Sequence, residues 1–418
     1  MTARSTVRSV VFSLTAALAV VSASLPATAF AAGPYQITGT AVSHDSGFVR
    51  TEFTVQAGSH PLDRFKMVRL TREHGDGDQR GSILFLPPLG TTFSFYEQRD
   101  GVAGTGAPGT SIAEYFAQGG VDVYGYSPRF EGIPAGTCEA GVIDCSAIAG
   151  WDMQSQIDDI TFVRSQIEIL HPGTKIVAGG ASLGGILAIA VANAHPADYD
   201  GIFPWEGMLS SHDPQVLALN QGYCAGLQAQ LAAGIIYDGV GGNVFKEVTR
   251  QAKLNPAGLT PIPLFPPAFT NHQVLVAFVA VPTPGPATMP TPNYVFMNGS
   301  LPQDRLFYAS EARVEENVSR FVNYIPVALV RDVSCSLAGV ETQFVSNLSH
   351  FTAPVLMIGG GHGFGPYMGD QLALFGSTDK VIRLQPEFGH IDHMMTPRHR
   401  DFVERPIFDW ASRIFGHH

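Results

Sequence analysis

The sequence predicts an α/β protein whose mostly parallel sheet is covered by helices on both faces. Short runs that are largely apolar, as in strands buried on both sides, recur along the chain. Stretches with the apolar spacing of helices separate these runs. The chain is also long enough for a large core, because 45% of its 418 residues are hydrophobic and only 15% are charged.

Strands are expected wherever apolar and polar residues alternate or a short run is largely apolar. Residues 48–56 and 65–70 alternate. The largely apolar runs follow at 83–86, 121–124, 175–178, 199–203, 354–358 and 380–384, of which only 83–86 and 354–358 have no charged residue. Because helical stretches separate these runs, we expect consecutive strands to be parallel.

Helices are expected between the strands. The clearest is 153–170, where apolar residues recur every three to four positions with acidic and polar residues between them. The other expected helices are 112–118, 183–194, 367–374 and 401–415.

This strand–helix rhythm is interrupted once. The interrupting chain is irregular and rich in proline, above all at 263–267 and 282–286, where proline excludes a central strand or a helix interior. We therefore expect one core, formed by residues 32–207 and 351–418, with a cap or lid inserted at 208–350.

The N-terminus has the pattern of a secretory signal peptide. Arg4 and Arg8 precede an apolar run over 10–21, and small residues follow as far as Ala31. The run is shorter than the roughly 20 apolar residues that a membrane span needs. We expect 1–31 to be removed on export, leaving an extracellular or periplasmic protein without stable membrane insertion.

The charge balance excludes one class of partner. Lys and Arg number 25 against 36 Asp and Glu, which gives a formal net charge of −11. Nucleic-acid binders usually carry a basic surplus or a basic cluster, and this sequence has neither. We therefore expect no nucleic acid as a partner. The oligomeric state is not readable from the sequence.

Export makes the four cysteines candidates for disulfides. Four cysteines allow three pairings. We favour Cys138 with Cys145, which are close in sequence, and Cys224 with Cys335, which both lie in the inserted segment. The spacings match no zinc-binding pattern, so no metal is expected.

A G-x-S-x-G motif joins a predicted strand to a predicted helix. Its residues are Gly180, Ser182 and Gly184. In this setting the serine lies on a tight strand-to-helix turn, its hydroxyl is exposed, and the glycines let the neighbouring backbone pack closely. We therefore expect Ser182 to be a nucleophile. The alternative is a glycine-rich helix start with an idle serine.

With this motif in place, the chain resembles the α/β-hydrolase superfamily, and in particular a secreted, esterase- or lipase-like serine hydrolase. The resemblance extends over most of 48–415 through the strand order, the serine turn and the insertion. It implies an eight-stranded, mostly parallel sheet with a cap after the sixth strand. It also implies cofactor-independent catalysis by a serine, an acid and a histidine, in that order along the chain.

The resemblance places the histidine in a loop after the last strand. Gly389 and His390 lie there, and members of the superfamily commonly have Gly-His at this point, so His390 is the expected base. His393 is its competitor. The run from His390 to His393 also matches part of a metal-ligand motif of hydrolases. Phe388, however, stands where that motif has a further histidine.

The resemblance also implies an oxyanion hole made by two amides. One would belong to Leu183, directly after the nucleophile. The other would come from the loop after the third strand, where Pro87 and Pro88 have no amide hydrogen. Leu89 or Gly90 must then donate, and we favour Leu89.

The acid departs from the commonest pattern of the superfamily. The loop after the seventh strand, residues 359–365, contains no carboxylate and has His362 about where an acid is expected. A minority of members take the acid from the end of the sixth strand, where this chain has Glu206. A carboxylate in so apolar a segment needs a partner, which His390 would provide. Asp370 is the rival.

The inserted segment is poor in charge. Its aromatic and Met side chains could line an apolar pocket or pack a small core of the segment itself, and the sequence leaves this open for Phe265, Phe269, Phe278, Phe296, Phe307, Met289 and Met297. The expected substrate is a small-molecule or lipid-like carboxylic ester with apolar character. The same three residues would also serve an amidase, a peptidase or an acyltransferase, and an inactive binding protein could share the fold.

Overall fold

The computed structural model describes residues 35–73, 80–99, 109–239, 241–262, 268–279, 306–390 and 392–416. The predicted leader and the two proline-rich runs lie outside these residues. The described residues also leave out part of the expected pocket lining, namely Phe265, Phe296, Met289, Met297 and the side chain of Phe278.

A sheet of nine strands forms the centre of the fold, in the order β1-β2-β3-β5-β4-β6-β7-β10-β11. The pairs from β1 to β5 are antiparallel, and those from β5 to β11 are parallel. The strands are β1 (Gln36–Asp45), β2 (Phe48–Gln56), β3 (Arg64–Arg72), β4 (Ser82–Leu86), β5 (Asp122–Ser127), β6 (Ile176–Ala181), β7 (Gly201–Trp205), β10 (Val355–His362) and β11 (Lys380–Gly389).

The sheet has one strand more than the eight expected. The additional strand is β1, which pairs with β2 at the edge of the sheet. All ten of its residues are exposed, so it lacks the apolar alternation that reveals a half-buried strand in a sequence.

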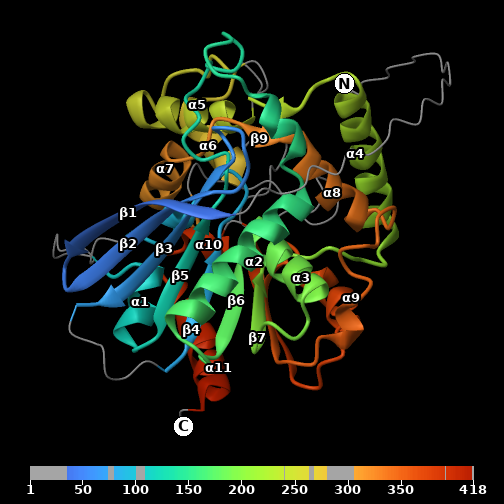
Figure 1. The fold of residues 1–418 in the computed structure, drawn as a ribbon. Coiled ribbons are helices and arrows are strands. Elements are labelled where there is room, and N and C mark those ends of the chain that lie inside the picture. Colours follow the sequence, from blue (N-terminus) through green and yellow to red (C-terminus); the bar gives the residue numbers. More distant parts are fainter. Residues whose placement is uncertain are drawn as a thin grey trace. The chain divides into compact units, whose positions relative to one another are not determined.

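The central strands of the sheet are buried on both faces. Along β4, Leu84 and Leu86 belong to one apolar cluster, whereas Ile83 and Phe85 belong to another. Helices α2 (Met153–Leu170) and α3 (Leu183–Ala194) supply the first cluster. Helices α1 (Ile112–Gln118) and α11 (Arg405–Phe415) supply the second. Figure 1 shows α2 and α3 on the side of the sheet nearer the viewer. This is the predicted α/β arrangement.

Local capping explains where the first helices begin. The Ser111 side chain accepts a hydrogen bond from the Glu114 amide, and the Glu114 carboxylate accepts one from the Ser111 amide, which starts α1. Asp152 caps α2 by accepting from the Ser155 amide at 2.9 Å. Helices α1, α2 and α3 have the same first and last residues as predicted.

Where the chain between β7 and β10 is described, about half of it is helical, which corrects the expectation of an irregular segment. It contains α4 (Pro214–Ala232), α5 (Gly241–Leu254), α6 (Asn271–Val279), α7 (Glu311–Ser319), α8 (Val327–Leu337) and the two-stranded pair β8 (Tyr237–Asp238) and β9 (Ile325–Pro326). The proline-rich runs on which that expectation depended are outside the described residues. In Figure 1 α5, α6 and α7 lie above one end of the sheet.

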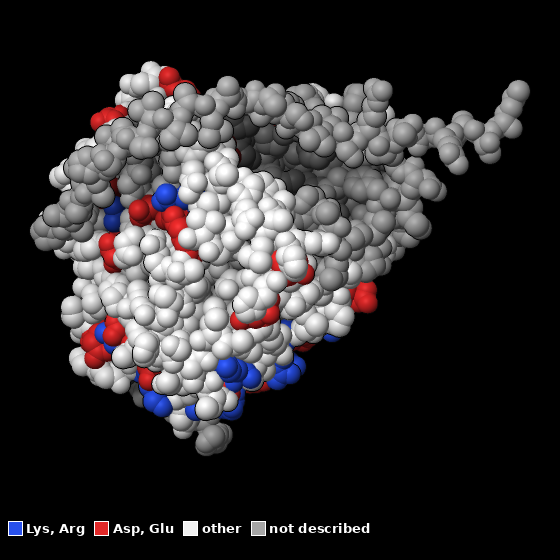
Figure 2. Space-filling model, turned by 90° about the vertical axis from the view of Figure 1, so that its right-hand side faces the viewer, with Lys and Arg blue, Asp and Glu red and all other residues white. Residues whose placement is uncertain are grey.

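Helix α4 contains no Lys, Arg, Asp or Glu, although most of its residues are exposed. It lies on the right of Figure 1, and Figure 2 shows the molecule from that side. Charged side chains gather toward the lower and left parts of that view, and much of the described surface between them is uncharged. An exposed helix without charge gives little sequence pattern, which is why it was not predicted.

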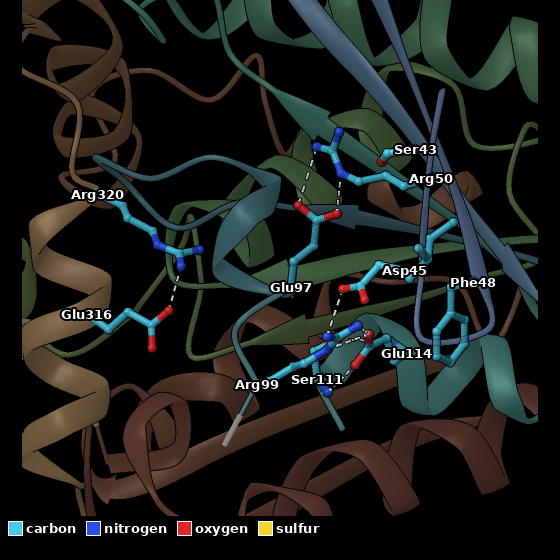
Figure 3. Close-up of a pocket in the computed structure, with 11 residues that line it drawn as sticks. Ser43, Asp45, Phe48, Arg50, Glu97, Arg99, Ser111, Glu114, Glu316 and Arg320 are labelled. Carbon is cyan, nitrogen blue, oxygen red and sulfur yellow. Dashed lines mark hydrogen bonds and ion pairs between the residues drawn. The ribbon is translucent and has the colours of Figure 1, made fainter. Parts of the chain in front are cut away.

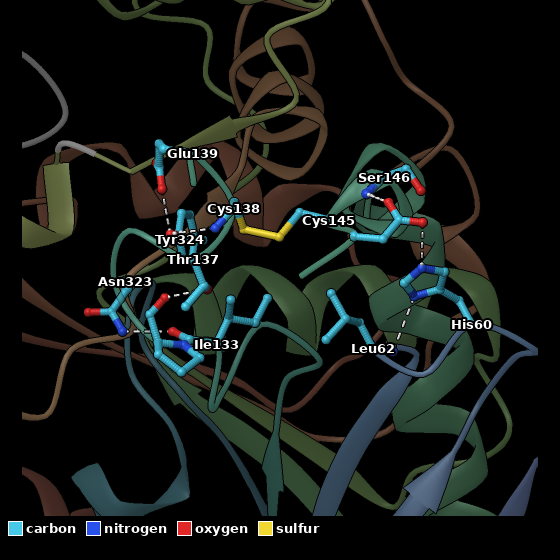
Figure 4. The surroundings of a disulfide bond; sticks show 12 residues. His60, Leu62, Ile133, Thr137, Cys138, Glu139, Cys145, Ser146, Asn323 and Tyr324 are labelled. Carbon is cyan, nitrogen blue, oxygen red and sulfur yellow. Dashed lines mark hydrogen bonds and ion pairs between the residues drawn. A yellow bond between two sulfur atoms is a disulfide. The ribbon is translucent and has the colours of Figure 1, made fainter. Parts of the chain in front are cut away.

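Two disulfides occur in the pairings favoured by the sequence. Cys224 of α4 is bonded to Cys335 of α8, with the two Cα atoms 4.8 Å apart. Cys138 is bonded to Cys145, with Cα atoms 5.6 Å apart, and closes a short loop after β5 (Figure 4).

That short loop contacts the chain between α7 and α8 (Figure 4). The Cys138 amide donates to the Tyr324 hydroxyl at 3.3 Å, and the same hydroxyl donates to Glu139 at 2.7 Å. Asn323 donates to the carbonyl of Ile133 at 2.7 Å. We call residues 321–324 the strap.

The remaining described elements complete the core. After β10 come α9 (Met368–Ala373), then β11 and α10 (Asp392–Met395), and a π-helical turn (Arg400–Glu404) leads into α11. Among the described residues, no helix has both the length and the apolar character that crossing a bilayer requires.

Candidate active site

Ser182 lies between β6 and α3 in a left-handed backbone conformation, with φ +55° and ψ −119°. A residue other than glycine adopts such a φ at a cost of about 1–3 kcal/mol, so the surrounding structure must impose it. The packing around the two glycines of the motif shows how this conformation is imposed. A Cβ atom at Gly180 or at Gly184 would collide with the carbonyl oxygen of Leu86 at the end of β4. The turn therefore wraps closely around that carbonyl, and only glycine fits on either side.

The structure brings together three side chains that are far apart in sequence. His390 follows β11 directly, and its Nε2 lies 3.0 Å from Oγ of Ser182. Its Nδ1 lies 2.9 Å from Oε2 of Glu206, which follows β7. A Nδ1–H group bonded to the carboxylate leaves Nε2 as an acceptor for the serine hydroxyl. The three groups thus form one continuous hydrogen-bonded chain.

Comparison with known proteins identifies the fold. No protein-family model and no curated protein sequence matches the chain. The solved structure of a candidate lipase from Sulfolobus solfataricus matches it with a TM-score of 0.60 at 16% identity, over 90% of this chain and 99% of that one. A highly thermostable carboxyl esterase from Bacillus coagulans, solved with glycerol, matches with a TM-score of 0.50 at 14% identity, over 91% and 99% of the two chains. This chain has the α/β-hydrolase fold.

In this α/β-hydrolase fold, Glu206 is fully buried and its charge is compensated by backbone amides. Oε2 accepts from the Phe364 amide at 3.2 Å, and Oε1 accepts from the Gly360 amide. A Cβ atom at Gly363 would contact Oε2, so glycine is needed there as well. The end of β10 and the loop after it, which contain no carboxylate of their own, therefore hold the carboxylate of Glu206, which follows β7.

Asp370, the rival acid, and His362, which stands about where an acid is expected, lie elsewhere. Asp370, on α9, accepts from the His212 amide at 2.7 Å and from the Ser211 hydroxyl at 3.4 Å. His362 ends β10 and is partly exposed, and no hydrogen bond to its Nδ1 is seen among the described residues. Neither residue joins the chain formed by Ser182, His390 and Glu206.

His393 is close to that chain without being part of it. Its ring is fully buried, its Nδ1 lies 3.9 Å from Oε1 of Glu206, and neither ring nitrogen has a hydrogen-bond partner among the described residues. Burial lowers the pKa of His393 to about 4, and the nearby positive form of His390 acts in the same direction, whereas Glu206 opposes both. The imidazole is therefore neutral at ordinary pH.

The predicted oxyanion amides lie at two neighbouring backbone segments. Leu183 is the first residue of α3, where helix amides point out of the helix end. Leu89 packs against the apolar cluster that contains Leu183, and its amide has no hydrogen-bond partner within the described residues. Gly90 has φ +79°, and its carbonyl accepts from the Val322 amide of the strap at 2.8 Å. The choice of Leu89 over Gly90 stays a prediction.

The described aromatic residues of the inserted segment have different surroundings. Phe269 packs against the second apolar cluster of the core. Phe307 lines a cavity of about 500 Å³ together with Phe388, whose ring is 4.9 Å from that of His393. The expected pocket function thus stays open for Phe307, and packing accounts for Phe269.

A second cavity, of about 340 Å³, has mostly charged and polar residues in its wall and contains none of the three site residues (Figure 3). Basic and acidic side chains pair along its wall: Arg50 with Glu97, Arg99 with Glu114, and Arg320 with Glu316. Because these charges are already compensated, the cavity offers no evident charged anchor for a ligand.

Sequence reasoning missed the groups that hold the site together. The amides of Gly360 and Phe364 belong to the glycine-rich stretch 359–365. The sequence shows that this stretch has no carboxylate, but it does not show that these two amides bind Glu206. Tyr96 was not singled out at all. Its fully buried hydroxyl contacts both the end of β4 and the serine turn. The glycine run was an available signal for the loop, whereas no sequence pattern marks Tyr96.

Proposed function

We propose that this protein is a secreted serine hydrolase that cleaves carboxylic esters through an acyl-enzyme on Ser182. The observation that carries the proposal is the continuous arrangement of Ser182, His390 and Glu206, with contacts of 3.0 and 2.9 Å. In this hydrogen-bonded arrangement Ser182 has the position of a nucleophile, His390 that of its base, and Glu206 that of the acid behind the base. The lipase and esterase descriptions of the two matching structures support the same reaction class.

In the first half of the reaction, Oγ of Ser182 attacks the ester carbonyl while Nε2 of His390 takes the hydroxyl proton. The resulting imidazolium is stabilised by Glu206, which is itself held by two amides. The amides of Leu183 and Leu89 donate to the oxyanion of the tetrahedral intermediate. The intermediate collapses when the C–O bond breaks, and His390 returns the proton to the departing alcohol.

In the second half, His390 takes a proton from water, and the hydroxide attacks the acyl carbonyl on Ser182. Collapse of the second tetrahedral intermediate breaks the bond to Oγ, and the proton on Nε2 restores the serine hydroxyl. The products are a carboxylic acid and an alcohol, and no cofactor takes part.

We assign residues 208–350 to a cap over this site and 1–31 to a leader removed on export. The hydrogen bond from the Val322 amide of the strap to the Gly90 carbonyl supports a cap that reaches the proposed oxyanion loop. Two disulfides support export to an oxidising compartment. The low charge of the segment favours an apolar-leaning ester.

The test is hydrolysis of a series of p-nitrophenyl esters with short to long acyl chains, by the parent protein and by Ser182→Ala. We expect turnover that is abolished by the substitution and by a serine-directed phosphonate, with the phosphonate bound to Ser182. Turnover of anilides in preference to esters would instead indicate an amidase. Absence of both turnover and labelling would favour a binding protein with this fold.

A further inference from the structure

The hydroxyl of Tyr96 bridges two backbone segments that meet beside the proposed nucleophile. It donates to the carbonyl oxygen of Leu86 at 2.7 Å and accepts from the amide of Ala181 at 2.9 Å. Leu86 is the last residue of β4 and opens the loop that leads to Leu89. Ala181 is the last residue of β6 and directly precedes Ser182. One oxygen atom thus touches the start of the oxyanion loop and the start of the serine turn.

The two segments need such a bridge because the sheet no longer connects them at this point. Strands β4 and β6 are paired as far as Leu86 and Gly180. Beyond that pair the oxyanion loop continues with Pro87 and Pro88, which have no amide hydrogen to donate. The Leu86 carbonyl is also the group around which Gly180 and Gly184 wrap. Its position therefore determines the shape of the serine turn.

Tyr96 is itself held firmly. It follows a single 3₁₀ turn (Phe93–Phe95) that Thr92 caps, so it is joined to the oxyanion loop through the chain as well. Its ring is fully buried, with the ring centroids of Phe85 and Phe95 at 4.6 and 5.0 Å. Burial raises the pKa of the Tyr96 hydroxyl above its usual value, so the group keeps its proton and can donate and accept at once.

We propose that Tyr96 is a positioning residue that fixes the proposed oxyanion loop relative to Ser182. The inference rests on the proposed function, because it assigns Tyr96 a part in the acylation step. The hydroxyl touches no reacting atom. It acts by holding the Leu86 carbonyl and the Ala181 amide in one arrangement, so that the oxyanion donors and the nucleophile keep their separation. A displacement of about 1 Å in such a site can reduce the rate by about 10²-fold.

The test compares Tyr96→Phe with Tyr126→Phe. Both substitutions remove one hydroxyl from a fully buried ring and leave the ring in place. The Tyr126 hydroxyl lies within donating distance of Gln156 at 2.6 Å and of Asp159 at 3.2 Å, both on α2, so this variant is a control for the loss of a buried hydroxyl and its hydrogen bonds. The measurements are kcat and KM on the best p-nitrophenyl ester, the rate at which a fluorophosphonate labels Ser182, and thermal unfolding.

We expect Tyr96→Phe to lower kcat and the labelling rate by roughly 10- to 100-fold with little change in KM. Tyr126→Phe should unfold at a similarly lowered temperature yet keep both rates. Equal rates in the two variants, with an active parent, would overturn the inference and leave the proposed function standing. A parent protein that neither turns over esters nor is labelled would overturn both.

Hydrogen exchange in the unmodified protein gives a second test that needs no variant. If the bridge exists, the Ala181 amide should exchange as slowly as the amides of β6 that are paired within the sheet. Exchange of the Ala181 amide at the rate of an exposed loop would overturn the inference even if Tyr96→Phe failed to fold.

Discussion

Ser182 and Glu206 have nearly the same positive φ angle, +55° and +52°, just past the ends of neighbouring strands. The residues before them, Ala181 and Trp205, are a registered pair of β6 and β7. Among the described residues, Ser46 is the only other non-glycine residue with a positive φ. The two turns also interlock, because a Cβ atom at Gly207 would lie 2.7 Å from the carbonyl oxygen of Ser182. The proposed nucleophile and acid are therefore placed by one paired feature of the sheet.

The first prediction concerns the acid. Glu206→Gln should lower kcat by about 10³- to 10⁴-fold, because an amide cannot stabilise the imidazolium of His390 or fix its tautomer. Folding should be intact by circular dichroism. Asp370→Asn is the matched control, because it also removes one carboxylate charge, and it should change kcat little. The reverse ranking would assign the acid to Asp370.

The second prediction concerns the loop that holds the carboxylate. Gly363→Ala places a methyl group against Oε2 of Glu206, so the carboxylate must move away from His390. We expect kcat to fall by about 10²-fold, in line with a displacement of about 1 Å. Gly369→Ala on α9 is the control, since a Cβ atom there would meet no neighbouring atom within 4 Å. Unchanged kcat in Gly363→Ala would show that the loop does not position Glu206.

The third prediction concerns the pH dependence of stability. Because the pKa of His393 is about 4 in the folded protein and about 6.5 when unfolded, the unfolded state binds a proton first as the pH falls. His393 should therefore reduce the free energy of unfolding by up to about 3 kcal/mol between pH 6.5 and 4, with no further loss below that range.

His393→Phe removes this titration while keeping a ring beside Phe388. Urea unfolding of the parent and the variant at several pH values should show two curves that diverge below pH 6.5, with the variant the less sensitive to acid. Parallel curves would mean that His393 is not held in its neutral form.

The fourth prediction separates the two disulfides. Replacing Cys138 and Cys145 by serine frees the loop whose amide binds Tyr324, and so loosens the strap whose Val322 amide binds Gly90. We expect kcat to fall several-fold with modest loss of stability. Replacing Cys224 and Cys335 instead removes the covalent link between α4 and α8, and should loosen the inserted segment more than the core. Limited proteolysis and kcat, measured on both double variants, distinguish these results.

Much of the fold was predictable because its signals are local. The ends of α2 follow from Asp152 and from the apolar spacing after it, and the serine turn follows from its glycines. Strand β1 and helix α4 were missed for a shared reason. The first is wholly exposed and the second has no charged residue, so neither shows a contrast between a buried and a solvated face.

Within the site, residue types that define the chemistry were predictable, whereas the groups that place them were not. Ser182, His390 and Glu206 are recognisable from motif and position, and the structure brings them together. The supporting partners are backbone atoms, such as the Gly360 amide and the Leu86 carbonyl. Every residue has such atoms, so the sequence cannot mark which of them are used.

The pairing of β7 with β10 also determines how late in synthesis the proposed site can form. The two strands are neighbours in the sheet, yet the whole inserted segment is made between them. Until β10 emerges, β7 is an open edge, and Glu206 lacks the amides of Gly360 and Phe364 that hold its charge. His390 appears later still. A growing chain would thus carry its proposed nucleophile and acid from about the middle of its synthesis and remain inert until His390 has been added.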